Sequence, residues 1–178
     1  MASDYGLNFG FRRSDESVRV SEGRIKTPST GALLLLGTAV SADPTNPGYL
    51  VPAAANAPCV SGFTGLLLQE EVWDRSIYER DRVDSFVLGI AKPNRLSIIT
   101  TGAGTKVWFR NTTAQDRADG RHIDAVTMFT TASVAVGRGL AWNGTSFVDV
   151  ASPTDPTSFG VVTFYDSSKA YVELVLTH

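Results

Sequence analysis

The chain has few of the residues that build disulfides, thiolate metal sites and most acid–base catalysts. It contains one cysteine, Cys59, and two histidines, His122 and His178, in 178 residues. A single cysteine cannot form a disulfide within the chain, and it cannot supply the several thiolates of a structural metal site. The sequence therefore argues against a secreted module held by disulfides, and a chain of this length can bury a core without one.

Neither sign of charge dominates, and no apolar run is long. Sixteen basic and eighteen acidic residues give a formal net charge of −2, whereas a dedicated nucleic-acid binder normally carries a concentrated basic face. The longest apolar stretch, residues 32–36, is far shorter than the ~20 residues of a membrane-spanning helix. The first 30 residues carry charges and turn formers in place of a signal peptide. We expect a soluble protein made in a cytoplasm, with neither nucleic acid nor membrane as a partner.

The sequence does contain one layout that is used twice. The first copy has apolar, turn-rich, apolar and glycine-started segments at 33–40, 43–48, 49–53 and 65–70. The second copy follows the same order at 134–142, 143–144, 145–148 and 160–164. Each copy predicts three strands joined by a tight turn and a polar loop. Asn143-Gly144 predicts a type I′ turn, which needs a positive φ at both central residues.

Strand signals dominate from about residue 29 onward. Runs rich in β-branched and aromatic residues occupy 85–90, 96–101, 106–110 and 171–176. In the last run Val172, Leu174 and Leu176 lie on one face, which predicts a strand that packs into the core. Gly102-Ala103-Gly104 predicts a hairpin loop between the second and third of these runs. We therefore expect an all-β fold: a small β-barrel or β-tulip-like domain built from two similar hairpin-rich halves, with an extended N-terminal arm.

The arm is predicted over residues 1–28, and the β-rich domain over residues 29–178. Tyr5, Leu7, Phe9 and Phe11 alternate with glycine and asparagine, which is the period of a strand with one apolar face. Two interpretations are open, namely a first strand paired within the domain and an arm added to a partner's sheet. Burying four such side chains contributes roughly 6–12 kcal/mol, which only offsets the ~7–14 kcal/mol needed to order the backbone. Such an arm therefore requires a sheet edge, or several arms acting together.

Two polar connections have no decisive pattern. Residues 70–84 place Trp73 and Ile77 four apart, as on a helix, among many charges, and a mixed-charge surface loop fits equally well. Within them Glu79, Asp81 and Asp84 lack the spacing of a calcium loop and predict surface ion pairs. Residues 111–127 are polar and turn-prone.

No set of side chains is spaced for catalysis. His122 and Asp124, with a serine such as Ser133, would be the base, orienter and nucleophile of a hydrolase, but no nucleophile-elbow spacing accompanies them. Gly137-Arg138-Gly139 is not followed by a helix pattern, so it does not predict a dinucleotide site. We assign no catalytic, cofactor-binding or metal-ligating residue, and we expect neither enzymatic activity nor a cofactor.

The sequence leaves two roles open for the three tryptophans. Trp73, Trp108 and Trp142 either form a platform on which a sugar stacks or lie in the core and at interfaces.

The repeated segments resemble the head-decoration proteins of tailed bacteriophages, lambda-type or related capsid-stabilising proteins. The resemblance is carried by Gly37-Thr38-Ala39-Val40, Asp43-Pro44, Gly48-Tyr49-Leu50-Val51-Pro52-Ala53 and Gly65-Leu66-Leu67-Leu68, and by a second copy from Gly137 through Phe164 to Leu176. It covers roughly residues 30–70 and 130–178. The charged segment 70–84 has no counterpart in that family.

The resemblance implies a structural virion protein on the outer capsid surface, made in the host cytoplasm. Such a protein stabilises contacts between subunits of the major capsid protein, its partner, and commonly acts as a homotrimer. The implied capsid contacts are the arm residues Tyr5, Leu7, Phe9, Phe11, Arg12 and Arg13. The alternative is a phage tail protein or a receptor- or carbohydrate-binding β module. Strand order and oligomeric state do not follow from the sequence.

Overall fold

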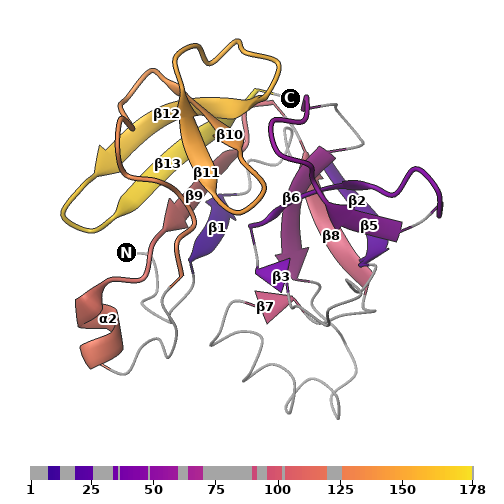
Figure 1. Cartoon of the computed structure of the whole chain (residues 1–178), viewed down its shortest axis with the longest axis horizontal. Helices are drawn as coiled ribbons and strands as arrows, with labels where there is room; N and C mark the ends of the chain where they lie inside the picture. Colours follow the sequence, from indigo (N-terminus) through magenta and orange to yellow (C-terminus); the bar gives the residue numbers. More distant parts are fainter. Residues whose placement is uncertain are drawn as a thin grey trace.

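The computed structural model of the chain consists almost entirely of β-strands (Figure 1). It describes residues 8–12, 19–25, 34–35, 37–47, 49–59, 64–69, 90–91, 96–101, 103–119 and 126–177. The elements are β1 (Phe9–Arg12), β2 (Arg19–Ile25), β3 (Leu34–Leu35), β4 (Ala39–Ala42), β5 (Tyr49–Pro52), β6 (Thr64–Gln69), β7 (Ile90–Ala91), β8 (Leu96–Thr101), β9 (Lys106–Arg110), α2 (Ala114–Ala118), β10 (Gly139–Trp142), β11 (Phe147–Val150), β12 (Ser158–Asp166) and β13 (Tyr171–Leu176). The all-β class expected from the sequence is confirmed.

The strands form two main sheets that lie side by side (Figure 1). In one sheet, the pairings of β2, β5, β4, β6 and β8 close into a ring. The other is a six-stranded sheet in the order β1-β9-β13-β12-β10-β11, and β3 and β7 form a separate two-stranded ladder. Within the named strands, β2 and β5 run parallel and the other pairs run antiparallel.

The two sheets contain one topology twice. In the ring, β4 lies between β5 and β6, and β8 and β2 follow beyond β6. In the six-stranded sheet, β10 lies between β11 and β12, and β13 and β9 follow beyond β12. The order β5-β4-β6-β8-β2 therefore matches β11-β10-β12-β13-β9, and the prediction of two similar halves is confirmed.

A glycine at the same place in each half explains part of the repeated sequence. Gly37 and Gly137 both have a positive φ, +82° and +88°. Their N–H groups donate to the carbonyls of Leu67 and Val162, each at 2.8 Å. A residue with a Cβ is disfavoured at such a φ, so each half needs glycine where the chain enters its middle strand.

The turns that follow the two middle strands also match. The Asp43 Oδ1 accepts hydrogen bonds from the Thr45 N–H (2.8 Å) and hydroxyl (2.7 Å). The Asn143 Oδ1 accepts from the Thr145 N–H (2.9 Å) and hydroxyl (3.0 Å). The predicted type I′ turn is wrong, because Gly144 has a positive φ but Asn143 does not. The Asn143 side chain instead folds over a four-residue loop as an Asx turn.

The predicted hairpin at Gly102-Ala103-Gly104 is also wrong, because β8 and β9 belong to different sheets. The Gly104 N–H donates to the Leu176 carbonyl at 2.8 Å, and the Leu176 N–H donates to the Thr105 carbonyl at 2.9 Å. These bonds attach the residues just before β9 to the end of β13. The short link therefore joins the two halves.

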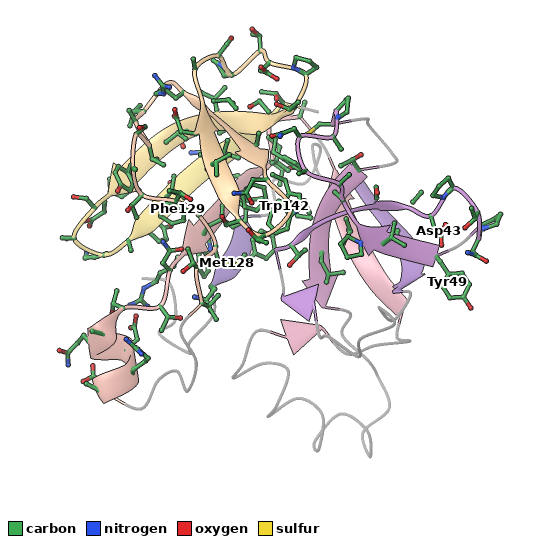
Figure 2. The ribbon with its side chains drawn as sticks, in the orientation of Figure 1. Asp43, Tyr49, Met128, Phe129 and Trp142 are labelled. Atoms are coloured by element: carbon green, nitrogen blue, oxygen red, sulfur yellow. The ribbon has the colours of Figure 1, made fainter. Side chains whose placement is uncertain are left out.

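In each half, the strand that follows the matching turn, β5 or β11, has a parallel neighbour. In the ring, β2 runs parallel to β5. In the second half, Phe129 forms a parallel bridge with Phe147 of β11. The Thr130 N–H donates to the Phe147 carbonyl, and the Phe147 N–H donates to the Met128 carbonyl, each at 2.8 Å. Figure 2 shows Met128 and Phe129 beside the six-stranded sheet.

The side chain of Asn111 connects this segment to the end of β9. Its Oδ1 accepts from the N–H groups of Met128 (2.7 Å) and Phe129 (3.0 Å), and its Nδ2 donates to the Phe129 carbonyl (2.8 Å). Between Asn111 and Met128 the described residues include α2, and the Thr112 N–H donates to the Val126 carbonyl at 2.9 Å. The strand that would close the second half is thus interrupted, and one side-chain amide bridges the interruption.

The core of the second half is centred on the ring of Phe147, which is fully buried. Its centroid lies 4.5 Å from that of Phe109, 5.1 Å from Trp142 and 5.4 Å from Phe159. Burial of each such side chain contributes about 1.5–3 kcal/mol. The predicted inward face of β13 is confirmed, because Val172, Leu174 and Leu176 are all buried.

Trp142 joins the two halves. It lies on the side of the six-stranded sheet that faces the ring (Figure 2). Its indole N–H donates to the Ala53 carbonyl at 3.2 Å, and its own carbonyl accepts from the Asn56 N–H at 2.8 Å. The side chain is 5% exposed.

Cys59 lies at the same junction. Its N–H donates to the Pro156 carbonyl at 2.8 Å, and its thiol donates to the Thr157 carbonyl at 3.5 Å. Burial, assisted by the charge of Asp155, raises the pKa of the Cys59 thiol to about 12. The thiol therefore stays protonated near neutral pH and acts as a packing group.

Candidate interaction surface

The outer face of the six-stranded sheet carries a group of aromatic side chains around one carboxylate. Along β9, Val107 and Phe109 are buried while Trp108 between them is half-buried. Along β13, Tyr171 and Glu173 alternate with the buried residues. These residues, together with Phe164 of β12, are called the aromatic cluster below: Trp108, Phe164, Tyr171 and Glu173.

An irregularity in β12 accounts for the position of Phe164. The pairing of β12 with β13 shifts register between Val162 and Phe164, so Phe164 lies opposite Glu173. Val162 is fully buried, whereas Phe164 is 47% exposed. In a regular strand, residues two apart share a face, so the bulge is what places Phe164 on the outside.

The cluster is tied together by short contacts. Tyr171 lies between the two other rings, its centroid 5.9 Å from that of Trp108 and 6.1 Å from that of Phe164. The Tyr171 hydroxyl donates to the Glu173 Oε1 at 2.8 Å. Gly10 of β1 lies opposite Trp108, and a Cβ on it would come within 2.4 Å of the indole. The indole therefore lies over the Gly10 backbone.

A second exposed apolar residue lies on a neighbouring segment. Val136 is 65% exposed. It precedes Gly137, whose N–H is bonded to the Val162 carbonyl, and Phe164 follows two residues after Val162. Val136 and Phe164 are the exposed large apolar residues of the described part of the chain; Phe164 lies on β12, and Val136 lies in the turn before β10.

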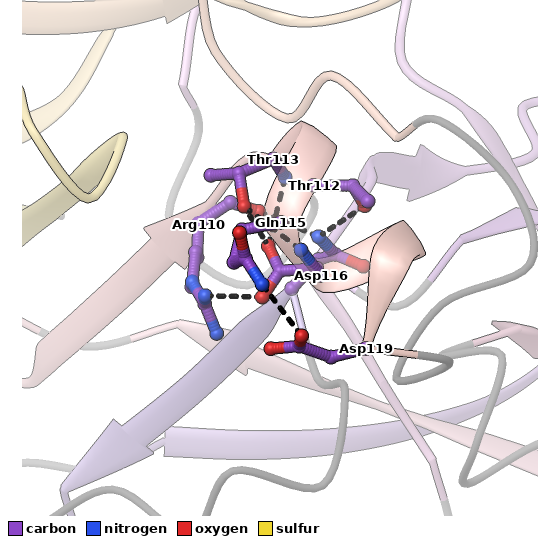
Figure 3. Close-up of polar contacts among 7 residues, drawn as sticks. Arg110, Thr112, Thr113, Gln115, Asp116 and Asp119 are labelled. Carbon is purple, nitrogen blue, oxygen red and sulfur yellow. Dashed lines mark hydrogen bonds and ion pairs between the residues drawn. The ribbon is translucent and has the colours of Figure 1, made fainter.

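A polar network lies at the end of β9, where α2 begins (Figure 3). Thr113 caps the helix: its hydroxyl accepts from the Asp116 N–H at 3.1 Å, and its N–H donates to the Asp116 Oδ2 at 2.8 Å. The Arg110 guanidinium donates to the Asp116 Oδ1 at 2.5 Å. Burial raises the pKa of Asp116, but the hydrogen bonds from Thr113 and the charge of Arg110 outweigh it, and the net pKa is lowered.

This network predicts a loss of stability in acid. A carboxylate whose folded pKa lies below its unfolded value stabilises the fold above the unfolded pKa, about 4, and this contribution is lost as pH falls through the folded pKa. We expect Asp116→Asn to lose less stability than the wild type when pH is lowered from about 5 to about 2. Urea unfolding at each pH measures this. Asp119→Asn, on the exposed side of the same turn, is the control and should retain the acid loss. An unchanged acid loss in Asp116→Asn would contradict the assignment.

The structure divides the six predicted arm residues into three groups. Phe9 is 5% exposed, with its ring centroid 5.4 Å from that of Phe109, and it packs against the Gly37 backbone. Its side chain is thus part of this chain's own core, which corrects its assignment as a capsid contact. Phe11 and Arg12 belong to β1, which pairs with β9. The other three, Tyr5, Leu7 and Arg13, lie outside the described residues.

The boundary predicted at residue 28 can be compared with the strand pairings. Before it, β1 pairs with β9, and β2 pairs with β8 and β5. The two strands described within residues 1–28 therefore pair with strands of the two sheets.

Most of the remaining candidates from the sequence cannot be placed in the described part of the chain. His122, Asp124, Trp73, Glu79, Asp81 and Asp84 lie outside the described residues. Ser133 is on an exposed turn. Trp142 is buried between the halves and so cannot share a sugar platform with the outward-facing Trp108. Arg138, between its two glycines, forms a bidentate ion pair with Asp149.

Two further findings concern the described residues alone. They contain no group of three histidine, cysteine, aspartate or glutamate side chains arranged to hold a metal ion. Among them there is also no helix with the length and apolarity needed to cross a bilayer.

Sequence reasoning missed two groups of residues around β9, namely the polar network at the start of α2 and the aromatic cluster. The capping box was visible as Thr113-x-x-Asp116, a pattern that marks a helix start. Tyr171 and Glu173 could have been placed on the outer face, because Val172, Leu174 and Leu176 were predicted inward. Phe164 could not, because nothing in the local sequence marks the bulge.

Comparison with known proteins gives a structural likeness but no match in sequence. No protein-family model matches the chain, and no curated protein matches it. Among solved structures, the chain is similar to the N-terminal base of the head fibre protein gp8.5 of bacteriophage phi29. The TM-score is 0.45 at 10% sequence identity, and the alignment covers 90% of this chain and 94% of that chain.

Proposed function

We propose that this chain is a structural virion protein that binds the outer surface of an assembled phage capsid and stabilises contacts between major capsid subunits. The observation that carries the proposal is the aromatic cluster, in which the rings of Trp108, Tyr171 and Phe164 adjoin one another on the outer face of one sheet. Exposed aromatic and apolar groups that adjoin one another mark interaction surfaces, whereas single exposed residues do not. The repeated segments that resemble decoration proteins also form matching three-stranded units.

The same proposal includes a homotrimer and a role without catalysis. A contact made by a few side chains is weak in one copy, but three such contacts made by one trimer act together through a high effective concentration. Of the predicted arm contacts we retain Tyr5, Leu7, Phe11, Arg12 and Arg13, and we leave out Phe9 because its side chain is buried in the core.

Binding to empty capsids tests the proposal. The purified chain is added to capsids assembled from the major capsid protein encoded in the same genome, and uptake is measured by sedimentation. We expect saturable uptake and a higher melting temperature of the capsid. Phe164→Glu should weaken uptake at least about tenfold, because it places a charge in the contact. Ala54→Glu, on an exposed site of the other half, should bind like the wild type.

The arm is tested by a truncation that stops before Asn8. The Asn8 side chain donates to the Arg110 carbonyl at 2.7 Å, so a longer deletion would also disturb the fold. Removal of residues 1–7 should weaken uptake while leaving the unfolding transition in place. If capsids take up no protein and the chain is instead retained on a glycan array, the receptor- or carbohydrate-binding alternative replaces this proposal.

A further inference from the structure

We propose that the aromatic cluster is a binding site for an arginine side chain of a partner, with Glu173 as the carboxylate that receives the guanidinium. The inference stands on the geometry of the sheet and does not require that the partner be a capsid. It concerns the chemistry that the outer face recognises.

The register places aromatic rings on three sides of Glu173. Trp108 of β9 lies directly opposite it on one side, and Phe164 of β12 lies directly opposite it on the other. Tyr171 precedes it by two residues on the same strand and face. Directly opposed residues in a sheet have Cβ atoms about 4.5–5.5 Å apart. The Glu173 carboxylate therefore has the aromatic side chains of Trp108, Phe164 and Tyr171 as its neighbours on this face.

Glu173 keeps acceptor capacity for an incoming cation. The Tyr171 hydroxyl donates to Oε1 and holds the carboxylate in place, and an ionised carboxylate has about four lone-pair sites. Among the residues that the structure describes, the ion pairs are Arg110–Asp116, Arg138–Asp149 and Lys169–Asp166, and none of them includes Glu173. Arg110, which lies opposite Tyr171, is committed to Asp116.

This combination favours arginine over other ligands. A guanidinium stacks on aromatic faces and pairs with a carboxylate through two parallel hydrogen bonds. Lysine offers a compact, strongly hydrated charge that does neither as well. An uncharged apolar ligand would bury the Glu173 charge with only the Tyr171 hydroxyl to compensate it, which is unfavourable. The occupant that fits is thus an arginine presented on a partner's surface.

A short peptide tests the site without any capsid. The blocked peptide acetyl-Gly-Arg-Gly-amide is titrated into the full chain, and the indole N–H resonance of Trp108, assigned with Trp108→Phe, is followed by NMR. We expect a saturable shift with a dissociation constant on the order of 1–10 mM. The lysine analogue should bind at least about threefold more weakly.

Matched variants identify the carboxylate. Glu173→Gln keeps the shape of the side chain and should weaken binding at least about fivefold. Tyr171→Phe keeps the ring but removes the hydroxyl that positions Glu173, and should give a smaller loss. Asp155→Asn, a carboxylate on a loop away from the cluster, should leave binding unchanged. The dispersion of the spectra shows that each variant is folded.

Either of two results would overturn the inference: no shift of the Trp108 indole at saturating peptide, or equal binding by Glu173→Gln. Equal affinity for the lysine peptide would overturn the choice of arginine. Failure of capsid uptake in the earlier experiment would not affect this result, because here the peptide is the ligand.

Discussion

Replacement of Trp142 by alanine is expected to lower the free energy of unfolding by about 3–5 kcal/mol, the usual cost of removing a buried tryptophan. The side chain is 5% exposed and packs on Phe147. The substitution leaves a cavity in the second half and also removes the indole donor to the Ala53 carbonyl of the first half. Urea unfolding followed by circular dichroism measures the change.

Two variants separate the causes of this loss. Trp142→Phe keeps most of the ring volume but not the N–H, and should cost about 1–2 kcal/mol. Trp108→Ala makes the same change on the outer face, where the residue is half-buried, and should cost less than Trp142→Ala. Equal losses at Trp108 and Trp142 would show that Trp142 does not join the halves as described.

Replacement of Asn111 by alanine is expected to cost about 2–4 kcal/mol, because each buried polar group left without its partner costs about 1–3 kcal/mol. The amide serves three backbone groups: the N–H groups of Met128 and Phe129 and the Phe129 carbonyl. These contacts hold the segment that bridges to Phe147 of β11. Amide hydrogen exchange should therefore accelerate at Met128 and Phe129 more than in β12 and β13.

Gln115→Ala is the matched control for Asn111→Ala. It removes a side-chain amide of similar size that is exposed and bonded to exposed Asp119. We expect a change within about 0.5 kcal/mol, as for most surface substitutions. If Asn111→Ala behaves like this control, or if exchange at Met128 and Phe129 is unchanged, the bridging role of Asn111 is wrong.

The repeat is where sequence and structure agree most closely. Gly37 and Gly137 stand at equivalent positions with equivalent hydrogen bonds, and Asp43 and Asn143 fold over equivalent turns. Such features are local, since a positive φ or an Asx turn is specified by one or two residues. The alternation that set the inward face of β13 is local in the same sense.

The wrong predictions concern which strands pair with one another and which side chains they bury. The glycine-rich link after β8 suggested a hairpin, but β8 pairs with β2 and β6, and β9 pairs with β13 and β1. An extended strand has two edges that accept many sequences, so its neighbours depend on the packing of the whole sheet. Phe9 was expected to face a partner for the same reason, and it is buried against Phe109 of its own chain.

The sequence by itself determined the all-β class, the two copies of a three-stranded unit and the face that β13 buries, because each depends on residues close together in the chain. Only the tertiary structure decided that Asn111 bridges the second half, that β1 completes the core with Phe9, and that Phe164 faces outward beside Glu173. Each of these depends on contacts between segments distant in sequence or on a shift in strand register, and neither leaves a periodic signal in the chain.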